Sequence, residues 1–259
     1  MDLFFLIGVL GVVAGFLSGL LGIGGGIIMA PLLLYLPQVF GFDTLSMQTV
    51  AGLTIVQGLV ACISGGLTHR KFNFLSVKLV GWMGITLFTT SFIGGITSKV
   101  AANDLLLIIF ALMAFFASVL MIMPKKVEVE SPDITTFAFS RYRAVSVSGA
   151  IGFLGGLVGQ GGSFILIPLM TSFLKVPTRI AIGSNLAIVF LSTLAAFIGK
   201  AMTFQIEWML AVPIVLTVIP AAYLGAHVSK RVSVGVLRNI LAICIALAAF
   251  RIGFSVVGY

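Results

Sequence analysis

The sequence contains very little charge. Asp, Glu, Lys and Arg make up 8% of the 259 residues, whereas 60% are hydrophobic and the mean hydropathy is +1.24. A soluble domain covers its surface with charges at roughly a quarter of its positions. The composition therefore excludes an ordinary soluble domain and predicts an all-α, polytopic membrane protein.

The uncharged stretches are long enough to cross a bilayer. A helix needs about 20 residues to span about 30 Å of hydrocarbon. Stretches of at least that length without Asp, Glu, Lys or Arg include 3–42, 44–69, 79–98, 105–124, 144–174 and 180–199. We divide the chain into ten expected helices at 3–21, 25–41, 48–67, 76–98, 104–123, 143–158, 162–174, 181–200, 206–227 and 235–256.

Histidine, acidic residues and cysteine are also scarce, with 2 His, 7 Asp plus Glu and 2 Cys. An intramembrane hydrolase needs Ser with His, a pair of Asp residues, or HExxH on a helix. None of these patterns occurs, so we expect no enzyme activity, metal or cofactor. Cys62 and Cys244 lie in apolar segments without CxxC spacing and are expected to be buried small hydrophobic residues.

The net charge of +8 reflects membrane topology and not a nucleic-acid partner, because the basic residues occupy short loops between apolar segments. Ten crossings with the N-terminus outside place 12 basic residues in cytoplasmic loops and 3 outside, namely Lys99, Lys200 and Arg251. Eight crossings with the N-terminus inside give only 9 against 6. We therefore expect ten crossings of the cell (inner) membrane with both termini outside. The first helix is expected to stay in the protein, because Met1-Asp2-Leu3 lacks the basic region of a signal peptide.

The chain contains an internal repeat. Residues 15–33 and 152–170 are identical at eleven of nineteen positions, at an offset of 137. The two copies contain Gly-Ile-Gly-Gly-Gly at 22–26 and Gly-Gln-Gly-Gly-Ser at 159–163. At an offset of 131, Gly52 matches Gly183 and Gly94 matches Gly225. We interpret 1–123 and 143–259 as two inverted five-helix repeats, joined by a polar cytoplasmic linker at 124–142.

Each glycine-rich run is followed by a proline, Pro31 or Pro168, which we expect to break the helix there. The predicted helices after the two runs are therefore short or broken. Such interruptions at corresponding places of two apolar halves indicate a shared binding site. In an inverted repeat, however, the two turns lie on opposite sides of the membrane unless the neighbouring helices bend toward its middle.

The motif Gly-Leu-x-Gly-x-Gly-Gly-[Gly/Ser] with its downstream proline occurs twice, and a second motif follows each copy. The second motif reads Thr-Val-Ala-Gly-Leu-Thr at 49–54 and Ile-Ala-Ile-Gly-Ser-Asn-Leu at 180–186. In these features the chain resembles the TauE/SafE family of sulfite exporters over nearly its whole length. The resemblance implies secondary transport of small sulfur-containing or organosulfonate anions.

An anion inside hydrocarbon needs hydrogen-bond donors, which helix N-termini and polar side chains supply. Glycines allow a ligand to approach the backbone, although they can equally serve only to form a tight turn. Gln57 and Asn185 could likewise bind substrate or join helices. The expected substrate-binding residues are Gly24, Gly25, Gly26, Thr54, Gln57, Gln160, Gly161, Gly162, Ser163, Ser184 and Asn185. Lys175 and Arg179 are further candidates for attracting anions to the cytoplasmic mouth, or they only set topology.

We expect export of the anion by alternating access, although the sequence itself gives no direction of transport. No Asp or Glu is expected in the middle of a helix, so there is no carboxylate for proton coupling. The membrane potential can instead drive export, at about 2.3 kcal/mol per charge per 100 mV. Uptake is the main alternative, and a membrane subunit without transport activity is a further one. The expected partners are a small anion and the lipid bilayer, and a homodimer is left open.

Overall fold

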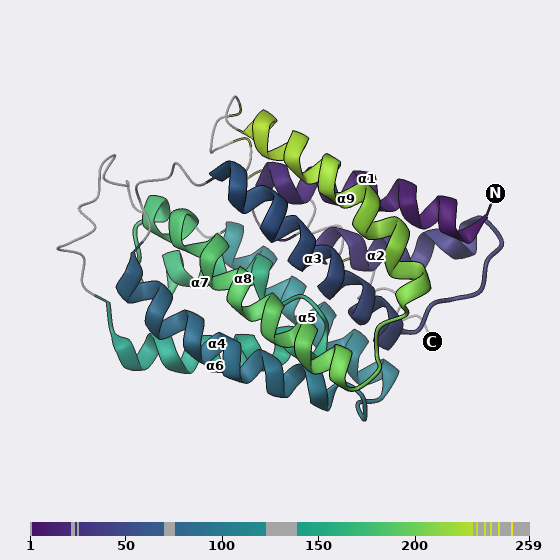
Figure 1. Ribbon diagram of the computed structural model, residues 1–259. Helices are drawn as coiled ribbons and strands as arrows, with labels where there is room; N and C mark the ends of the chain where they lie inside the picture. The colour runs from purple at the N-terminus through teal and green to yellow at the C-terminus, as the bar shows by residue number, and fades with distance from the viewer. Residues whose placement is uncertain are drawn as a thin grey trace.

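The computed structural model describes residues 2–21, 24, 26–69, 76–122 and 139–229, together with 232, 236, 239, 243 and 250. Within these residues the chain forms helices and no strand (Figure 1). The helices are α1 (Leu3–Leu21), α2 (Gly26–Val39), α3 (Met47–His69), α4 (Val77–Thr97), α5 (Asn103–Ile122), α6 (Arg141–Leu157), α7 (Ser163–Ser172), α8 (Thr178–Met202) and α9 (Trp208–Ser229).

The helix bounds follow the apolar segments of the sequence. Each of the first nine predicted segments contains one helix, whose ends lie within three residues of the predicted ends. Most of the tenth predicted segment, 235–256, and most of the linker at 124–142 lie outside the described residues. Six helices contain spans long and apolar enough to cross a membrane: Leu3–Leu21, Met47–Ser64, Val77–Thr97, Asn103–Leu120, Ser184–Met202 and Trp208–Ser229. An all-helical polytopic membrane protein is thus confirmed, and the number of ten crossings stays a prediction.

The two helices after the glycine-rich runs are short, as expected. α2 has 14 residues and α7 has 10. Pro31 and Pro168 do not break them, contrary to our expectation, because each is the sixth residue of a helix that continues beyond it. A proline at such a position removes one backbone donor from the helix. The irregular backbone lies in the turns that precede the two helices.

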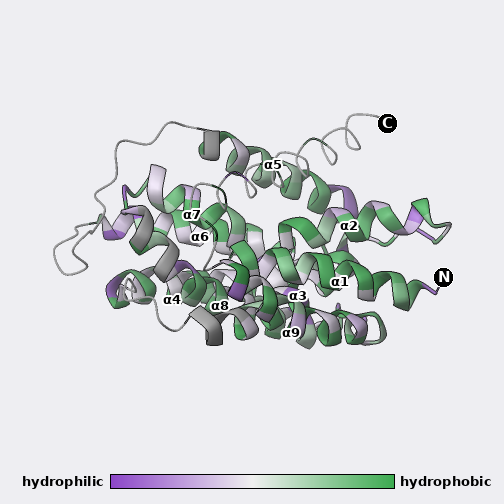
Figure 2. Cartoon of the chain, turned by 90° about the horizontal axis from the view of Figure 1, so that it is seen from above, coloured by the Kyte–Doolittle hydropathy of each residue, from purple (hydrophilic) through white to green (hydrophobic). Residues whose placement is uncertain are grey.

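The outer surface of the helix bundle is apolar. Figure 2 shows that the helices carry mostly hydrophobic residues along their lengths. Phe5, Phe116 and Leu216 are all more than half exposed. Exposed apolar surface on this scale is unfavourable in water and is favourable against lipid.

The first helix of each half of the chain packs along the fourth helix of the other half. α1 lies along α9 and α6 along α4 (Figure 1). A Cβ at Gly94 would collide with the carbonyl oxygen of Phe153, and a Cβ at Gly225 with that of Phe16. Phe153 follows Phe16 by 137 residues and Gly225 follows Gly94 by 131, which are the two offsets of the sequence repeat. Corresponding residues therefore make corresponding contacts.

Candidate functional site

Glycines form a tight turn at the end of α6. The φ angles of Gly159, Gly161 and Gly162 are +74°, +58° and +73°, a region that residues with a Cβ rarely adopt. The backbone amides of Gln160 and Gly161 both donate to the carbonyl of Gly155, at 2.8 and 3.0 Å. The chain therefore folds back over the end of α6 before α7 begins at Ser163.

The first glycine-rich run forms the connection between α1 and α2. Gly24 has a φ of +75°, in the same left-handed region. Gly25 lies outside the described residues, so its predicted role in binding stays untested. α2 then begins at Gly26.

The two turns lie against each other. A Cβ at Gly26 would collide with the side-chain amide of Gln160, and a Cβ at Gly24 would lie 3.6 Å from the Cβ of Ser163. Residues about 137 positions apart in the sequence thus meet inside the protein. Gly24 and Gly26 therefore lie beside the second turn.

Helix α3 covers both turns with a single face. Thr54 donates its hydroxyl to the carbonyl of Gly159, at 3.1 Å. One helical turn later, a Cβ at Gly58 would lie 3.3 Å from the carbonyl oxygen of Gly24. Because Gln57 is three residues after Thr54 and next to Gly58, it lies on this same face of α3.

Helix α8 covers the turns from another side. A Cβ at Gly24 would lie 3.4 Å from Cγ1 of Val189. Ser192 donates its hydroxyl to the carbonyl of Gly161, at 2.8 Å. Asn185 is fully buried and lies four residues before Val189, so it shares the face of α8 that contacts the turns.

Three polar side chains at this junction are buried without a hydrogen-bond partner among the described residues. Gln57 is 0% exposed and Gln160 is 2% exposed, and neither atom of either side-chain amide is paired. The hydroxyl of Ser163, a residue 1% exposed, is likewise unpaired. Buried polar groups are paired in most proteins, so three unpaired ones near each other need a physical reason. We call Gly24, Gly26, Gln57, Gln160 and Ser163 the two-turn site.

Two other predicted binding residues hydrogen-bond the backbone, and their role in substrate binding stays a prediction. The hydroxyl of Thr54 is used by the bond to Gly159, and the hydroxyl of Ser184 accepts a bond from the amide of Ser76, at 3.0 Å. Ser76 caps the start of α4. Gly161 and Gly162 are closely packed, since a Cβ on either would meet the side chain of Thr193 or Ile151.

Lys200 was expected among the basic residues of the short loops, whereas the structure buries it within a helix. It lies in the last turn of α8 and is 0% exposed. Its ammonium donates to Oγ of Ser98 at 2.6 Å, to the carbonyl of Leu157 at 3.2 Å and to Oε1 of Gln205 at 3.4 Å. The sequence does not distinguish Lys200 from other lysines at the ends of apolar helices, because its partners Ser98 and Leu157 are distant along the chain.

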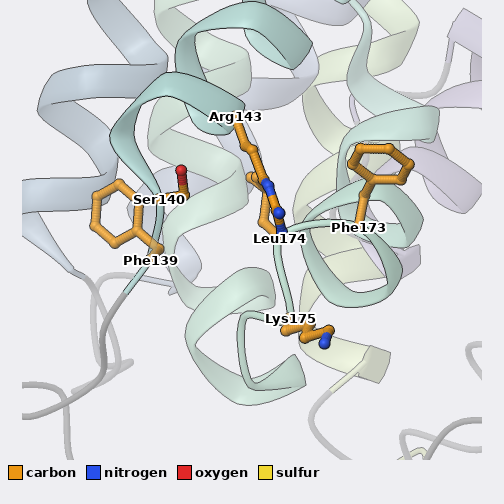
Figure 3. Close-up of a pocket in the computed structure, with 6 residues that line it drawn as sticks. All are labelled: Phe139, Ser140, Arg143, Phe173, Leu174 and Lys175. Atoms are coloured by element: carbon orange, nitrogen blue, oxygen red, sulfur yellow. The ribbon is translucent and has the colours of Figure 1, made fainter.

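A separate pocket of about 270 Å³ lies between the start of α6 and the end of α7. Figure 3 shows Arg143 reaching from α6 toward the loop that carries Leu174 and Lys175, with Phe139 and Phe173 on either side. Lys175, a predicted attractor of anions, is exposed here next to a second cation. The side chain of Arg179 lies outside the described residues.

Comparison with known proteins identifies the family. The family model described as "Sulfite exporter TauE/SafE" matches residues 7–252. The chain belongs to the TauE/SafE family. Among its relatives is the "Probable membrane transporter protein YunE" of Bacillus subtilis, 23% identical over 94% of this chain and 95% of the relative. "Probable membrane transporter protein MJ0441" of Methanocaldococcus jannaschii is 23% identical over 90% and 89% of the two chains.

A TauE/SafE relative from Haemophilus influenzae, also named "Probable membrane transporter protein", is 27% identical over 68% of this chain and 65% of its own. No solved structure shows a significant match to the chain. The family resemblance predicted from the repeated motifs is therefore confirmed, and the relatives are named as membrane transporters.

Proposed function

We propose that this TauE/SafE protein is a secondary transporter of small sulfur-containing anions, such as sulfite or organosulfonates, and binds them at the two-turn site. The observation that carries the proposal is the group of unpaired buried polar atoms on Gln57, Gln160 and Ser163. Each of these side chains can donate a hydrogen bond to an anionic oxygen. An anion among them would satisfy groups that the protein otherwise leaves unpaired.

The backbone at the site has the same preference for negative charge. α2 begins at Gly26 and α7 begins at Ser163, so two helix N-termini meet there. Each N-terminus carries a partial positive charge, and two such ends repel each other unless an anion lies between them. Neutral donors and helix ends also hold an anion less tightly than a direct ion pair would, which allows release on the other side of the membrane.

The corresponding contacts of α1 with α9 and of α6 with α4 support an architecture of two inverted five-helix repeats, 1–123 and 143–259. In this proposal ten segments cross the membrane, the linker 124–142 is cytoplasmic and both termini are outside. Rocking of one repeat against the other exposes the two-turn site to each side in turn. The membrane potential drives an anion outward through this cycle, and uptake is the same cycle in reverse.

The decisive experiment is substrate flux through the purified chain in proteoliposomes. We expect accelerated movement of at least one of sulfite, sulfate, thiosulfate, sulfoacetate and taurine, and a dependence of that flux on an imposed membrane potential. Empty liposomes are the control. Flux by the chain alone excludes the alternative of a subunit without transport activity, whereas absence of both flux and binding for every probe would contradict the proposal.

A further inference from the structure

Lys200 is a buried lysine whose amine has no acidic partner among the described residues. Its three hydrogen-bond acceptors are a hydroxyl, a backbone carbonyl and a side-chain amide, all of them neutral. Glu207, the acidic residue nearest in the sequence, is exposed and is not one of the acceptors. Neutral acceptors satisfy the hydrogen-bonding capacity of an ammonium but leave its charge uncompensated, which is unfavourable away from water.

The network around Lys200 fixes the ammonium in place. Ser98 bonds both to Lys200 and to Oε1 of Gln205, the latter at 2.6 Å. The amide nitrogen of Gln205 donates to the carbonyl of Gly95, at 2.9 Å. A lysine that only needed to reach water could extend past the end of α8. This one is held inside by groups from α4, α6 and the segment after α8.

The same network lies next to the second turn of the two-turn site. Leu157, which accepts a bond from Lys200, is the last residue of α6, and Gln160 follows only three residues later. Three residues span at most about 11 Å between Cα atoms, and the fold-back of the turn shortens this path. Helix α3 connects the two places as well, since Ala51 packs on Gly159 while Gly52 packs on the carbonyl of Gln205.

We propose that Lys200 supplies the fixed positive charge that compensates a substrate anion held at the two-turn site. The inference rests on the proposed function and deepens it. Lys200 does not touch the anion and acts through the electrostatic potential at the site. The neutral donors of the site then orient the anion. The charge of Lys200, next to the second turn, offsets the hydration free energy that the anion loses.

A through-space charge has a signature that a structural role lacks, because its effect grows with the charge of the ligand. At about 10 Å and an effective dielectric constant of about 20, removal of one positive charge weakens binding of a monovalent anion roughly tenfold. The same removal weakens binding of a divalent anion roughly a hundredfold. Damage to the shape of the site has no reason to follow ligand charge in this way.

The first test compares Lys200→Gln with Lys200→Arg in the purified full chain. The probes are ethanesulfonate, with one negative charge, and thiosulfate and sulfate, with two. We expect Lys200→Gln to weaken binding of the monovalent probe roughly tenfold and of the divalent probes roughly a hundredfold, and Lys200→Arg to keep both affinities within a few fold. An equal loss for both charges, or no loss, would overturn the inference.

A second pair of variants keeps Lys200 itself and so avoids misfolding caused by its removal. Gln205→Glu places a carboxylate beside the ammonium and cancels its charge, whereas Gln205→Met removes the same hydrogen bonds without adding charge. We expect Gln205→Glu to reproduce the charge-dependent loss and Gln205→Met to show a smaller loss, equal for all probes. Identical behaviour of the two variants would overturn the inference.

The outcomes also separate this inference from the proposed function. Wild-type protein that binds and moves none of the probes contradicts the anion carrier, and the role of Lys200 falls with it. Wild-type protein that binds a probe, together with Lys200→Gln and Gln205→Glu variants that bind it equally well, contradicts the role of Lys200 alone.

Discussion

The two glycine-rich runs each place a glycine with positive φ at a corresponding position, Gly24 and Gly161, but they differ in what they contribute to the site. The first turn supplies Gly24 and Gly26, which have no side chains, and the second supplies the amide of Gln160 and the hydroxyl of Ser163. The amide of Gln160 occupies the space that a side chain at Gly26 would need. One turn is thus the receiving surface and the other is the source of donors.

The largest effect is expected from Gly159→Ala, which changes the backbone of the second turn. Gly159 has a φ of +74°, and a Cβ there would collide with the backbone of Ala51. Positive φ and overpacking together cost on the order of 3 kcal/mol of folding free energy. We expect a lower melting temperature in detergent and loss of flux.

Gly41→Ala is the matched control for this variant. Gly41 has a similar φ of +80°, but nothing lies within 4 Å of the added Cβ. Only the conformational cost remains, about 1 kcal/mol. Equal destabilisation by the two substitutions would contradict the close packing of the second turn on α3.

The next effect concerns the donor side of the comparison. Gln160→Met keeps the approximate volume of the side chain but removes its amide. Loss of a hydrogen bond to a charged ligand costs about 1.5–3 kcal/mol, so anion affinity should fall roughly 10- to 100-fold. Because the buried amide is unpaired without ligand, the melting temperature of the free protein should stay equal or rise. A fall in both quantities would indicate that Gln160 is structural.

Gly26→Ala tests the receiving side. The three atoms nearest to its Cβ would all belong to the movable end of Gln160, so we expect the fold to remain and the amide to shift. Anion affinity should then fall about tenfold. In a Gln160→Ala background the same substitution should have little further effect, which a double-mutant cycle measures. Additive losses would show that Gly26 and Gln160 act separately.

The sequence predicted the helices better than it predicted the site. Helix ends could be placed because charges, glycines and prolines interrupt the apolar segments locally. The contact between Gly26 and Gln160 could not be predicted, because periodicity along a helix does not indicate which distant segment packs against it. The hydrogen bonds of Thr54 and Ser184 could not be predicted either, because their partners Gly159 and Ser76 lie 105 and 108 residues away.

The smallest effect is expected from Ser163→Ala, at the point where the second turn differs from Gly26 of the first. The hydroxyl of Ser163 is unpaired in the protein, so its removal should leave the melting temperature unchanged. A single neutral donor contributes about 0.5–1.5 kcal/mol, so anion affinity should fall roughly two- to tenfold. Ser148→Ala is the control, because Ser148 on α6 is also buried with an unpaired hydroxyl, and it lies about 13 Å along the helix from Leu157. If both variants weaken binding alike, a buried unpaired hydroxyl does not by itself mark the site. If only Ser163→Ala weakens anion binding, the hydroxyl of the second turn is a donor of the site.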